Sequence, residues 1–364
     1  MIIENSRFIS NDGVSSVSCM LYLPEGEIRG VVQLVHGMVE HKERYTDFMA
    51  YLAENGFACC IHDHLGHGHT ARSEEEQGYF GEPSGWRNLV MDVARFCRLT
   101  QSRAELKGKP YFLFGHSMGS FVARLAAVEL EGALTGAIFC GTCGERKEAA
   151  LAVKLVESII RRQGPMVRPK IIDTLMFGSY NKHFGPVYTG KEWLGRNLAV
   201  GRSHAQDPLC GFLFTAAGYK DLLRLIIECN TRGWYAAMDE SLPVLLNGGA
   251  MDPVSDYGKG VAQVARRLRT AGCADVTLKL YPGARHEILN ELNKAEVYAD
   301  ILSWLEARLP GLSRRKFGKK TASTSPLLLT RDASWIILIT IKNASMRTWF
   351  DRFLSREPPV GVRR

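Results

Sequence analysis

Short apolar segments of strand length alternate with longer segments of helical periodicity along most of this 364-residue chain. The apolar segments predict buried strands at residues 17–23, 31–36, 57–63, 111–114, 134–140, 244–247 and 276–281. Helices are predicted between and after them at residues 45–55, 88–106, 120–130, 257–270 and 294–309. Strands that alternate with helices form βαβ units. We therefore expect an α/β fold with a mostly parallel central sheet and helices on both of its faces.

The alternation stops between residues 144 and 235 and then resumes. Residues 144–235 contain helical segments at 149–162 and 219–229 but no convincing internal strand. Because the strand and helix pattern continues afterwards, we interpret this stretch as a helical cap inserted at the ligand-binding edge of one domain. Residues 1–143 and 236–312 would then form the two parts of the core. The alternative is a second, independent domain.

The C-terminal residues 313–364 differ from the rest of the chain in charge. They contain twelve Lys and Arg against three Asp and Glu, so they carry +9 and leave −1 for residues 1–312. The basicity belongs to this extension alone, and we expect no nucleic-acid partner. Met346, Trp349 and Phe353 belong to an apolar stripe of helical spacing that could lie on an anionic membrane. The interpretation we favour is a poorly ordered extension without a catalytic role.

Several features bear on the cellular compartment. The first ten residues lack a cationic segment followed by an apolar run, so we expect no signal peptide. The nine cysteines have no framework spacing, which is more typical of a reducing cytoplasm than of a disulfide scaffold. Cys140 and Cys143 form a Cys-x-x-Cys pair, which we expect to be two buried thiols. We expect a cytoplasmic protein, possible peripheral membrane contact through the cap or the basic extension, and an oligomeric state that the sequence does not constrain.

The sequence Gly-His-Ser-Met-Gly at 115–119 is the motif with the clearest chemistry. It directly follows a predicted strand and directly precedes a predicted helix, which is the context of a nucleophile elbow. In such a tight turn, glycine two positions before and after the serine avoids a steric clash. Ser117 would lie at a helix N-terminus, where free N–H groups favour a developing negative charge. We therefore predict Ser117 as a nucleophile.

An activated serine needs a base and an acid, which follow it in this type of fold in the order Ser, Asp or Glu, His. Asp252 comes just after the predicted strand at 244–247, and His286 comes just after the strand at 276–281. Functional groups gather at that edge of an open α/β sheet. Taken alone, Asp252 is also consistent with a turn before Pro253, and His286 with a surface loop. Asp256 is the nearest competing acid, but its position is typical of a helix cap.

The oxyanion of an acyl-transfer reaction needs two backbone donors. We predict the N–H of Met118, directly after the nucleophile, and the N–H of Met38, in the loop that follows the predicted strand at 31–36. The histidine-rich segment at 62–69 contains metal-ligand types, but its spacing matches no hydrolytic metal site, and we interpret it as a glycine-bent loop. We expect neither a metal nor an organic cofactor.

These residues resemble the monoacylglycerol lipase and lysophospholipase group of α/β-hydrolases, which are serine aminopeptidase S33-like enzymes. The likeness covers about residues 10–310. It rests on His-Gly-Met-Val-Glu-His-Lys-Glu-Arg-Tyr at 36–45, Asp-His-Leu-Gly-His-Gly at 63–68, Gly-His-Ser-Met-Gly at 115–119, Asp-Pro-Leu-Cys-Gly-Phe at 207–212, Gly-Ala-Met-Asp at 249–252 and Gly-Ala-Arg-His at 283–286.

The resemblance implies an α/β-hydrolase fold with an inserted cap, the same triad and the same oxyanion donors. It also implies that an apolar face of the cap holds an acyl chain. The cap residues that fit this role are Leu209, Phe212, Leu213 and Phe214. His36 and Gly37, beside Met38, are expected to border the same substrate. Two features depart from the family: Ser120 stands where members often carry glycine, and the extension beyond Leu312 has no counterpart.

Together these inferences predict a serine hydrolase that cleaves an acyl-lipid ester, either a monoacylglycerol or a lysophospholipid, through an acyl-enzyme. Three alternatives stay open. A transacylase would use the same triad with an alcohol acceptor, a carboxylesterase would act on small non-lipid esters, and a scaffold protein would use the fold without catalysis.

Overall fold

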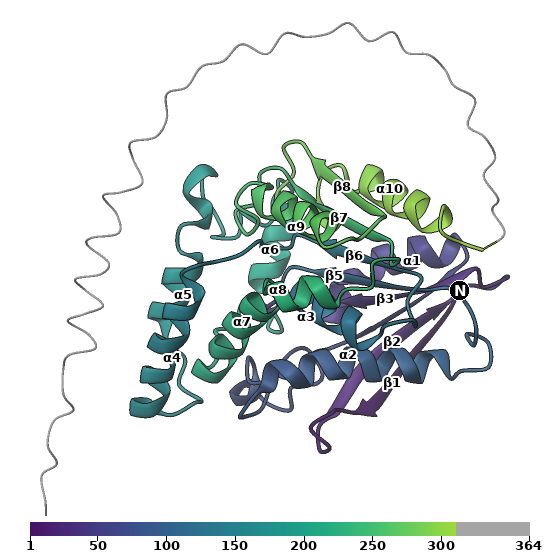
Figure 1. The fold of residues 1–364 in the computed structure, drawn as a ribbon. Coiled ribbons are helices and arrows are strands. Elements are labelled where there is room, and N and C mark those ends of the chain that lie inside the picture. Colours follow the sequence, from purple (N-terminus) through teal and green to yellow (C-terminus); the bar gives the residue numbers. More distant parts are fainter. Residues whose placement is uncertain (311–364) are drawn as a thin grey trace, which may run out of the picture. The chain divides into compact units, whose positions relative to one another are not determined.

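The computed structural model of the protein describes residues 1–310, and the predictions made for the C-terminal extension lie outside these described residues. An eight-stranded sheet forms the centre, with the strand order β1-β2-β4-β3-β5-β6-β7-β8 (Figure 1). The strands are β1 (Ile2–Ile9), β2 (Ser16–Leu23), β3 (Gly30–Val35), β4 (Phe57–His62), β5 (Tyr111–His116), β6 (Gly136–Cys140), β7 (Val244–Gly249) and β8 (Val276–Tyr281).

Strands β3 to β8 run parallel to one another, whereas β2 pairs antiparallel with β4, and this mostly parallel sheet confirms the predicted α/β class. Every residue of β3, β4, β5, β6 and β7 is buried, because helices cover the sheet on both sides. The sequence pattern does not predict β1, which runs antiparallel to β2 at the edge of the sheet. Most side chains of β1 are exposed, so its apolar alternation is weak.

Helices α1 (Thr46–Glu54) and α10 (Lys294–Glu306) pack on one face of the sheet, where Phe48, Leu52 and Trp304 join the core formed by Phe112 and Ile138. Helices α2 (Gly85–Gln101) and α3 (Met118–Glu129) cover the opposite face, and α9 (Lys259–Thr270) contacts β7 and β8 (Figure 1). No helix within residues 1–310 combines the length and the apolar character that a membrane crossing requires.

Between β6 and β7 the chain forms a helical insertion, residues 141–243, all of which the structure describes. This segment contains no strand, as the sequence predicts, and α7 lies against α4 and also contacts α2 and α3. Three of its helices are short and escape the periodicity analysis. The helices are α4 (Ala149–Gln163), α5 (Lys170–Phe177), α6 (Leu198–Gln206), α7 (Ala216–Glu228) and α8 (Arg232–Ala237), with the 3-10 helix η3 (Tyr180–His183) after α5.

Arg124 fastens this insertion to the core. The guanidinium of Arg124 is fully buried in α3 and donates hydrogen bonds to the Thr142 hydroxyl (3.3 Å), the Cys143 carbonyl (3.1 Å) and the Asn230 side chain (3.1 Å). It also lies 4.3 Å from the ring centroid of Trp234. One side chain thus joins α3 to both ends of the helical insertion, and its charge is balanced by oxygen acceptors and an aromatic face.

We predict that Arg124→Met lowers the free energy of unfolding by about 3 kcal/mol, because it leaves several buried acceptors without a donor. Arg124→Lys should recover little of this loss, since an ammonium cannot reproduce the planar fork. Urea unfolding measures both effects. The control is Arg95→Met on the exposed side of α2, which should change stability by less than about 0.5 kcal/mol. Equal stability of wild type and Arg124→Met would contradict the anchoring role.

Candidate functional site

Ser117 lies in a sharp turn between β5 and α3. Its backbone has φ 54° and ψ −123°, a left-handed conformation that is costly for a residue other than glycine. The turn requires close packing on both sides. A Cβ at Gly115 would lie 2.4 Å from the Gly119 carbonyl oxygen, and a Cβ at Gly119 would lie 2.2 Å from the Val35 carbonyl oxygen. Gly119 therefore allows α3 to begin directly against β3, Gly115 allows α3 to lie close to β5, and the Ser117 side chain is presented above the sheet edge.

Asp252 and His286 follow β7 and β8, at the ends that the sequence predicts. The His286 Nδ1 atom lies 3.0 Å from the Asp252 Oδ1 atom, and both side chains are buried. The His286 ring also packs against Trp193, with 5.1 Å between the ring centroids. The competing acid, Asp256, is exposed and instead lies 3.5 Å from the Lys259 ammonium. The structure thus brings Asp252, and not Asp256, to the histidine.

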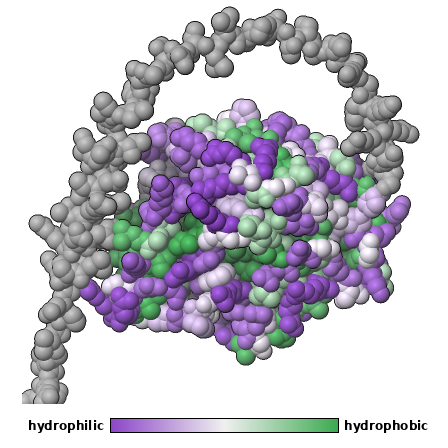
Figure 2. All heavy atoms as spheres, viewed as in Figure 1, coloured by the Kyte–Doolittle hydropathy of each residue, from purple (hydrophilic) through white to green (hydrophobic). Residues whose placement is uncertain are grey.

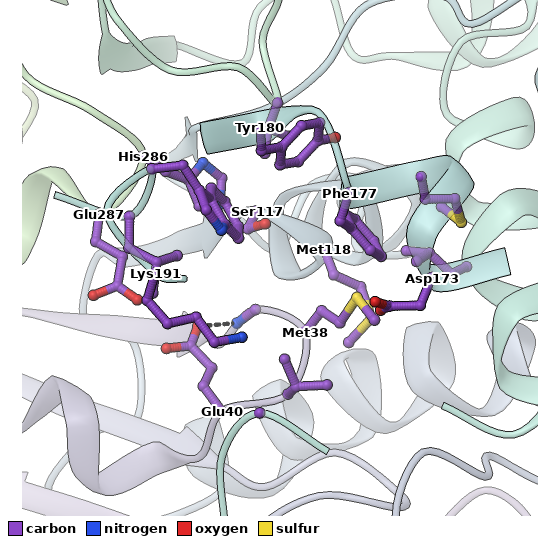
Figure 3. A pocket seen from close by; sticks show the side chains of 18 of the residues that line it. Met38, Glu40, Ser117, Met118, Asp173, Phe177, Tyr180, Lys191, His286 and Glu287 are labelled. Carbon is purple, nitrogen blue, oxygen red and sulfur yellow. Dashed lines mark hydrogen bonds between the residues drawn. The ribbon is translucent and has the colours of Figure 1, made fainter. Parts of the chain in front are cut away.

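Ser117 and His286 face a common cavity of about 370 Å³. Figure 3 shows their side chains next to each other, with Glu40, Lys191 and Glu287 on one side and Met118 and Phe177 on the other. The side with Glu40, Lys191 and Glu287, called the polar end below, is therefore more charged than the side with Met118 and Phe177, called the apolar end, although the Asp173 carboxylate also lies on the latter side. Residues of the helical insertion form much of its wall, among them Phe177, Tyr180, Trp193, Leu213, Leu222 and Ile226.

The predicted substrate-contacting residues divide into two groups. Gly37, Phe212 and Leu213 line the cavity. Three others do not line the cavity, and the structure corrects the expectation for them: His36, Leu209 and Phe214.

Each of the three has a local reason for lying elsewhere. The His36 ring is turned into the protein, where its Nε2 atom accepts the backbone N–H of His64 (3.0 Å). Phe214 is fully buried against Phe80, with 5.1 Å between the ring centroids. Leu209 belongs to a turn that its own N–H stabilises by a hydrogen bond to the Asp207 carboxylate (2.9 Å).

The aromatic wall residues Tyr180 and Trp193 are missed by the sequence analysis. They come from short elements of the helical insertion, and no spacing in the sequence relates them to Ser117. A weak signal exists in composition, because residues 177–193 contain five aromatic side chains in a segment without strand pattern.

The two predicted oxyanion donors come from separate elements. Met118 is the first residue of α3, where N–H groups have no acceptor within the helix. Met38 lies in the loop after β3, and both of its neighbours are fixed. The Gly37 N–H donates to the Glu40 carboxylate (2.5 Å), and the Val39 N–H donates to the His67 Nε2 atom (3.3 Å). Val39 itself has φ 51°, so this loop is held in a conformation that an isolated chain would rarely adopt.

Glu40 belongs to a buried network of charges behind the cavity. Arg44 donates to Glu40 (3.1 Å) and also pairs with Glu287 (2.6 Å), the residue after His286. His116 Nδ1 lies 3.5 Å from the Glu40 carboxylate. Burial alone would raise the pKa of Glu40. Its interactions with His116 and Arg44 outweigh burial and hold the pKa well below the usual range. The carboxylate is therefore charged and can anchor the Met38 loop through Gly37.

His41, Asp207 and Cys210 lie close enough for their ligand atoms to approach within 4.8 Å of one another. Both nitrogens of His41 are already engaged, with Glu43 (2.6 Å) and Asp207 (2.8 Å). Burial would lower the pKa of His41. Hydrogen bonds with Cys210, Glu43 and Asp207 outweigh it and raise the pKa to about 11. A metal ligand must be a neutral imidazole, so this trio fits a clamp between core and insertion better than a metal site.

The histidine-rich segment after β4 is buried beneath the Met38 loop. Burial lowers the pKa of His62 to about 3 and that of His67 to about 4, so both rings are neutral at pH 7. His62 has no hydrogen-bond partner for either ring nitrogen among the described residues and packs against Phe8 and Phe96. His67, in contrast, uses its Nε2 atom to hold Val39.

These buried histidines make the fold sensitive to acid. Below the ordinary histidine pKa of about 6.5, the unfolded chain takes up protons that the folded chain does not, until the pH reaches the folded-state values of about 4 and about 3. Stability should therefore fall across this range by as much as about 1.4 kcal/mol per pH unit for each such ring. Two buried carboxyl groups have the opposite effect on stability as the pH falls, because burial raises the pKa of Asp92 to about 6 and that of Asp221 to about 7.

We predict that the free energy of unfolding of His62→Phe falls less steeply between pH 6.5 and pH 4 than that of wild type. The two slopes should differ by the contribution of one proton. The aromatic neighbours of His62 can accept a phenyl ring, so the variant should remain folded at pH 7.5. Urea unfolding at a series of pH values measures the slope. His183→Gln, at an exposed position, is the control and should keep the wild-type slope. An unchanged slope in His62→Phe would show that this ring is already protonated in the folded state.

The sequence and the fold are similar to those of known proteins. The sequence model of a family described as serine aminopeptidase, S33 matches residues 26–293. The monoglyceride lipase of Homo sapiens is 27% identical over 299 residues, which cover 80% of this chain and 86% of that protein. Among solved structures, a thermostable carboxyl esterase from Bacillus coagulans in complex with glycerol is 29% identical, covers 84% of this chain and 99% of that one, and has a TM-score of 0.79.

A soluble variant of the monoglyceride lipase from Saccharomyces cerevisiae, solved with a substrate analog, has a TM-score of 0.68 at 22% identity. This likeness covers 85% of this chain and 96% of that one and bears on the fold alone. The family model, in contrast, spans well over half of the chain. The chain therefore belongs to the serine aminopeptidase S33 family of α/β-hydrolases, within the group that includes the monoacylglycerol lipases.

Proposed function

We propose that this protein is a serine hydrolase that cleaves carboxylic esters of acyl lipids, with Ser117, His286 and Asp252 as its triad. The observation that carries the proposal is the pairing of Asp252 with His286 at 3.0 Å, beside a cavity that the strained Ser117 turn also faces. The similarity to lipases and esterases, described above, supports the same reaction class.

In the proposed reaction, the Ser117 hydroxyl attacks the ester carbonyl while the Nε2 atom of His286 accepts its proton. Asp252 holds the imidazole in the required tautomer and stabilises the imidazolium. The N–H groups of Met38 and Met118 receive the oxyanion of the tetrahedral intermediate. His286 then returns the proton to the departing alcohol, which leaves an acyl-enzyme. Water, activated by His286, attacks this acyl-enzyme and releases the carboxylic acid.

The two ends of the cavity support a lipid ester as the substrate. An acyl lipid combines an apolar chain with a polar alcohol, and the scissile bond lies between them. Phe177 offers an apolar wall for the chain, whereas Glu40 and Glu287 border the other end. Leu213 and Ile226 add further apolar surface to the cavity wall. We propose that the helical insertion is the cap that encloses the chain, and that the alcohol occupies the polar end.

The surface of the helical insertion also suits a lipid source. Figure 2 shows apolar surface on the side of the molecule where α4 and α5 lie in Figure 1. Leu151 of α4 and Ile171 and Leu175 of α5 are each more than two-fifths exposed. An exposed apolar patch on a cap next to the cavity favours contact with a lipid surface, from which a substrate could enter.

The substrate class is tested by comparing esters of increasing acyl length. We predict that kcat/KM is higher for octanoyl and longer monoacylglycerols than for p-nitrophenyl acetate, once the value for p-nitrophenyl acetate is corrected for its better leaving group. The reason is that only the longer acyl chains fill the apolar end of the cavity. The products are identified with glycerol present. A preference for acetyl esters would favour a small-ester carboxylesterase, and transfer of the acyl group to glycerol would favour a transacylase.

The role of Asp252 is tested by an isosteric change. We predict that Asp252→Asn lowers kcat by about 10⁴-fold, because the amide favours the wrong tautomer of His286. Asp256→Asn, four residues later and exposed, is the matched control and should stay within twofold of wild type. Initial rates of fatty-acid release measure both. Similar rates for the two variants would remove Asp252 from the proposed relay.

A further inference from the structure

Lys191 is a cation of the cavity wall that forms no ion pair within residues 1–310. It lies between η3 and α6, on the same side of Ser117 as Glu40 and Glu287 (Figure 3). The ammonium forms no salt bridge or side-chain hydrogen bond with any residue between 1 and 310. Burial lowers the pKa of Lys191, because a charged ammonium is less stable away from water. An unpaired cation that faces a cavity favours an anionic ligand.

His204 is a second group of the same wall that lacks a partner. Its side chain on α6 is 4% exposed, and its Nδ1 atom has no hydrogen-bond partner among the described residues. Burial lowers the pKa of His204 to about 4, so the ring is neutral at pH 7 and keeps one N–H donor. In the tautomer that carries the proton on Nδ1, this atom is a buried donor without an acceptor, and a ligand oxygen would satisfy it.

These two nitrogens converge on one point. A Cβ built on Gly211 would lie 3.9 Å from the Lys191 Nζ atom and 3.9 Å from the His204 Nδ1 atom. Gly211 has φ 69°, and its N–H donates to the Val39 carbonyl (3.0 Å). The point therefore lies beside the loop that carries Met38, the proposed oxyanion donor, and glycine leaves it free of a side chain.

The acids near this point are engaged elsewhere. Arg44 pairs with both Glu40 (3.1 Å) and Glu287 (2.6 Å). Asp173 attracts Lys191 through space without pairing with it, and it accepts a hydrogen bond from the Tyr219 hydroxyl (3.0 Å). Figure 3 shows Asp173 on the side of the cavity where Phe177 lies. None of these three acids thus forms an ion pair with Lys191, although Asp173 and Glu287 still attract its charge through space.

We propose that Lys191 and His204 form an anion subsite that binds a phosphate carried by the alcohol part of the substrate. This inference rests on the proposed hydrolase function and narrows its substrate to acyl glycerol phosphates in preference to uncharged monoacylglycerols. Lys191 supplies the charge and His204 supplies a directed hydrogen bond. The subsite lies at the polar end of the cavity, where the departing alcohol is expected, and next to the Met38 loop.

The experiment compares two substrates that differ by the phosphate alone: 1-octanoylglycerol 3-phosphate and 1-octanoylglycerol, both below their micelle concentrations. We expect a higher kcat/KM for the phosphate ester in wild type. Lys191→Met should lower the ratio of the two kcat/KM values at least tenfold, and Lys191→Arg should restore most of it. Lys182→Met, at an exposed position of η3, is the matched control and should keep the wild-type ratio. A ratio that is the same in wild type and Lys191→Met overturns the subsite.

Binding of octyl phosphate separates this proposal from the proposed hydrolase function. Calorimetry on Ser117→Ala should show that adding Lys191→Met, or His204→Phe, weakens octyl phosphate binding at least fivefold, with inorganic phosphate and octanoate as comparison ligands. Retained octyl phosphate binding in an enzyme that hydrolyses neither ester would contradict the hydrolase function and keep the subsite. Equal octyl phosphate binding with and without the Lys191 ammonium would overturn the subsite. Binding of octanoate as tight as that of octyl phosphate would show a carboxylate site and overturn the assignment to phosphate.

Discussion

The close approach of α3 to β3 is the constraint on which the site depends. The approach exists because position 119 carries no Cβ, which would otherwise meet the Val35 carbonyl oxygen at 2.2 Å. A Cβ at position 115 of β5 would likewise meet the Gly119 carbonyl oxygen of α3 at 2.4 Å. Two consequences follow from the same turn. Ser117 takes a left-handed conformation above the sheet, and the N–H of Met118 stands free at the beginning of a helix. The proposed nucleophile and one proposed oxyanion donor are therefore products of one backbone geometry.

Behind this turn, buried charges connect the three loops that carry the proposed reaction. Glu40 holds the Met38 loop through the Gly37 N–H, and Arg44 links Glu40 to Glu287 beside His286. The ring of His116 donates through Nε2 to the His286 carbonyl (3.2 Å). Buried ion pairs contribute little net stability because desolvation offsets their attraction. Their value here is positional, since each pair fixes one loop relative to another at the cavity.

Much of the fold and the core of the site could be predicted from the sequence, because both follow local rules. Buried parallel strands are short apolar runs, and Asp252 and His286 come directly after two of them, where side chains of an α/β sheet converge. The resemblance to a family added the expectation of an apolar cap. Strand β1 could not be predicted by these rules, because its exposed side chains give no apolar alternation. Only its pairing with β2 holds it in the sheet.

The cavity wall could not be predicted, because tertiary packing decides which side of a short helix faces Ser117. Neighbouring residues of the same segment take different positions in the structure. Phe212 and Leu213 line the cavity, whereas Phe214 turns into the core against Phe80. The Lys191 ammonium is equally invisible in the sequence, where it is one cation among many; its place beside Gly211 depends on how η3, α6 and the Met38 loop pack together.

Mapping a covalent adduct tests the central claim, that Ser117 is activated by His286, most directly. The protein is treated with a fluorophosphonate, digested, and the modified peptide is sequenced by mass spectrometry. The account predicts a single phosphonylated residue, Ser117, and a rate of modification that falls by orders of magnitude in a folded His286→Ala variant. Modification of another residue, or an unchanged rate without the imidazole, would contradict the account.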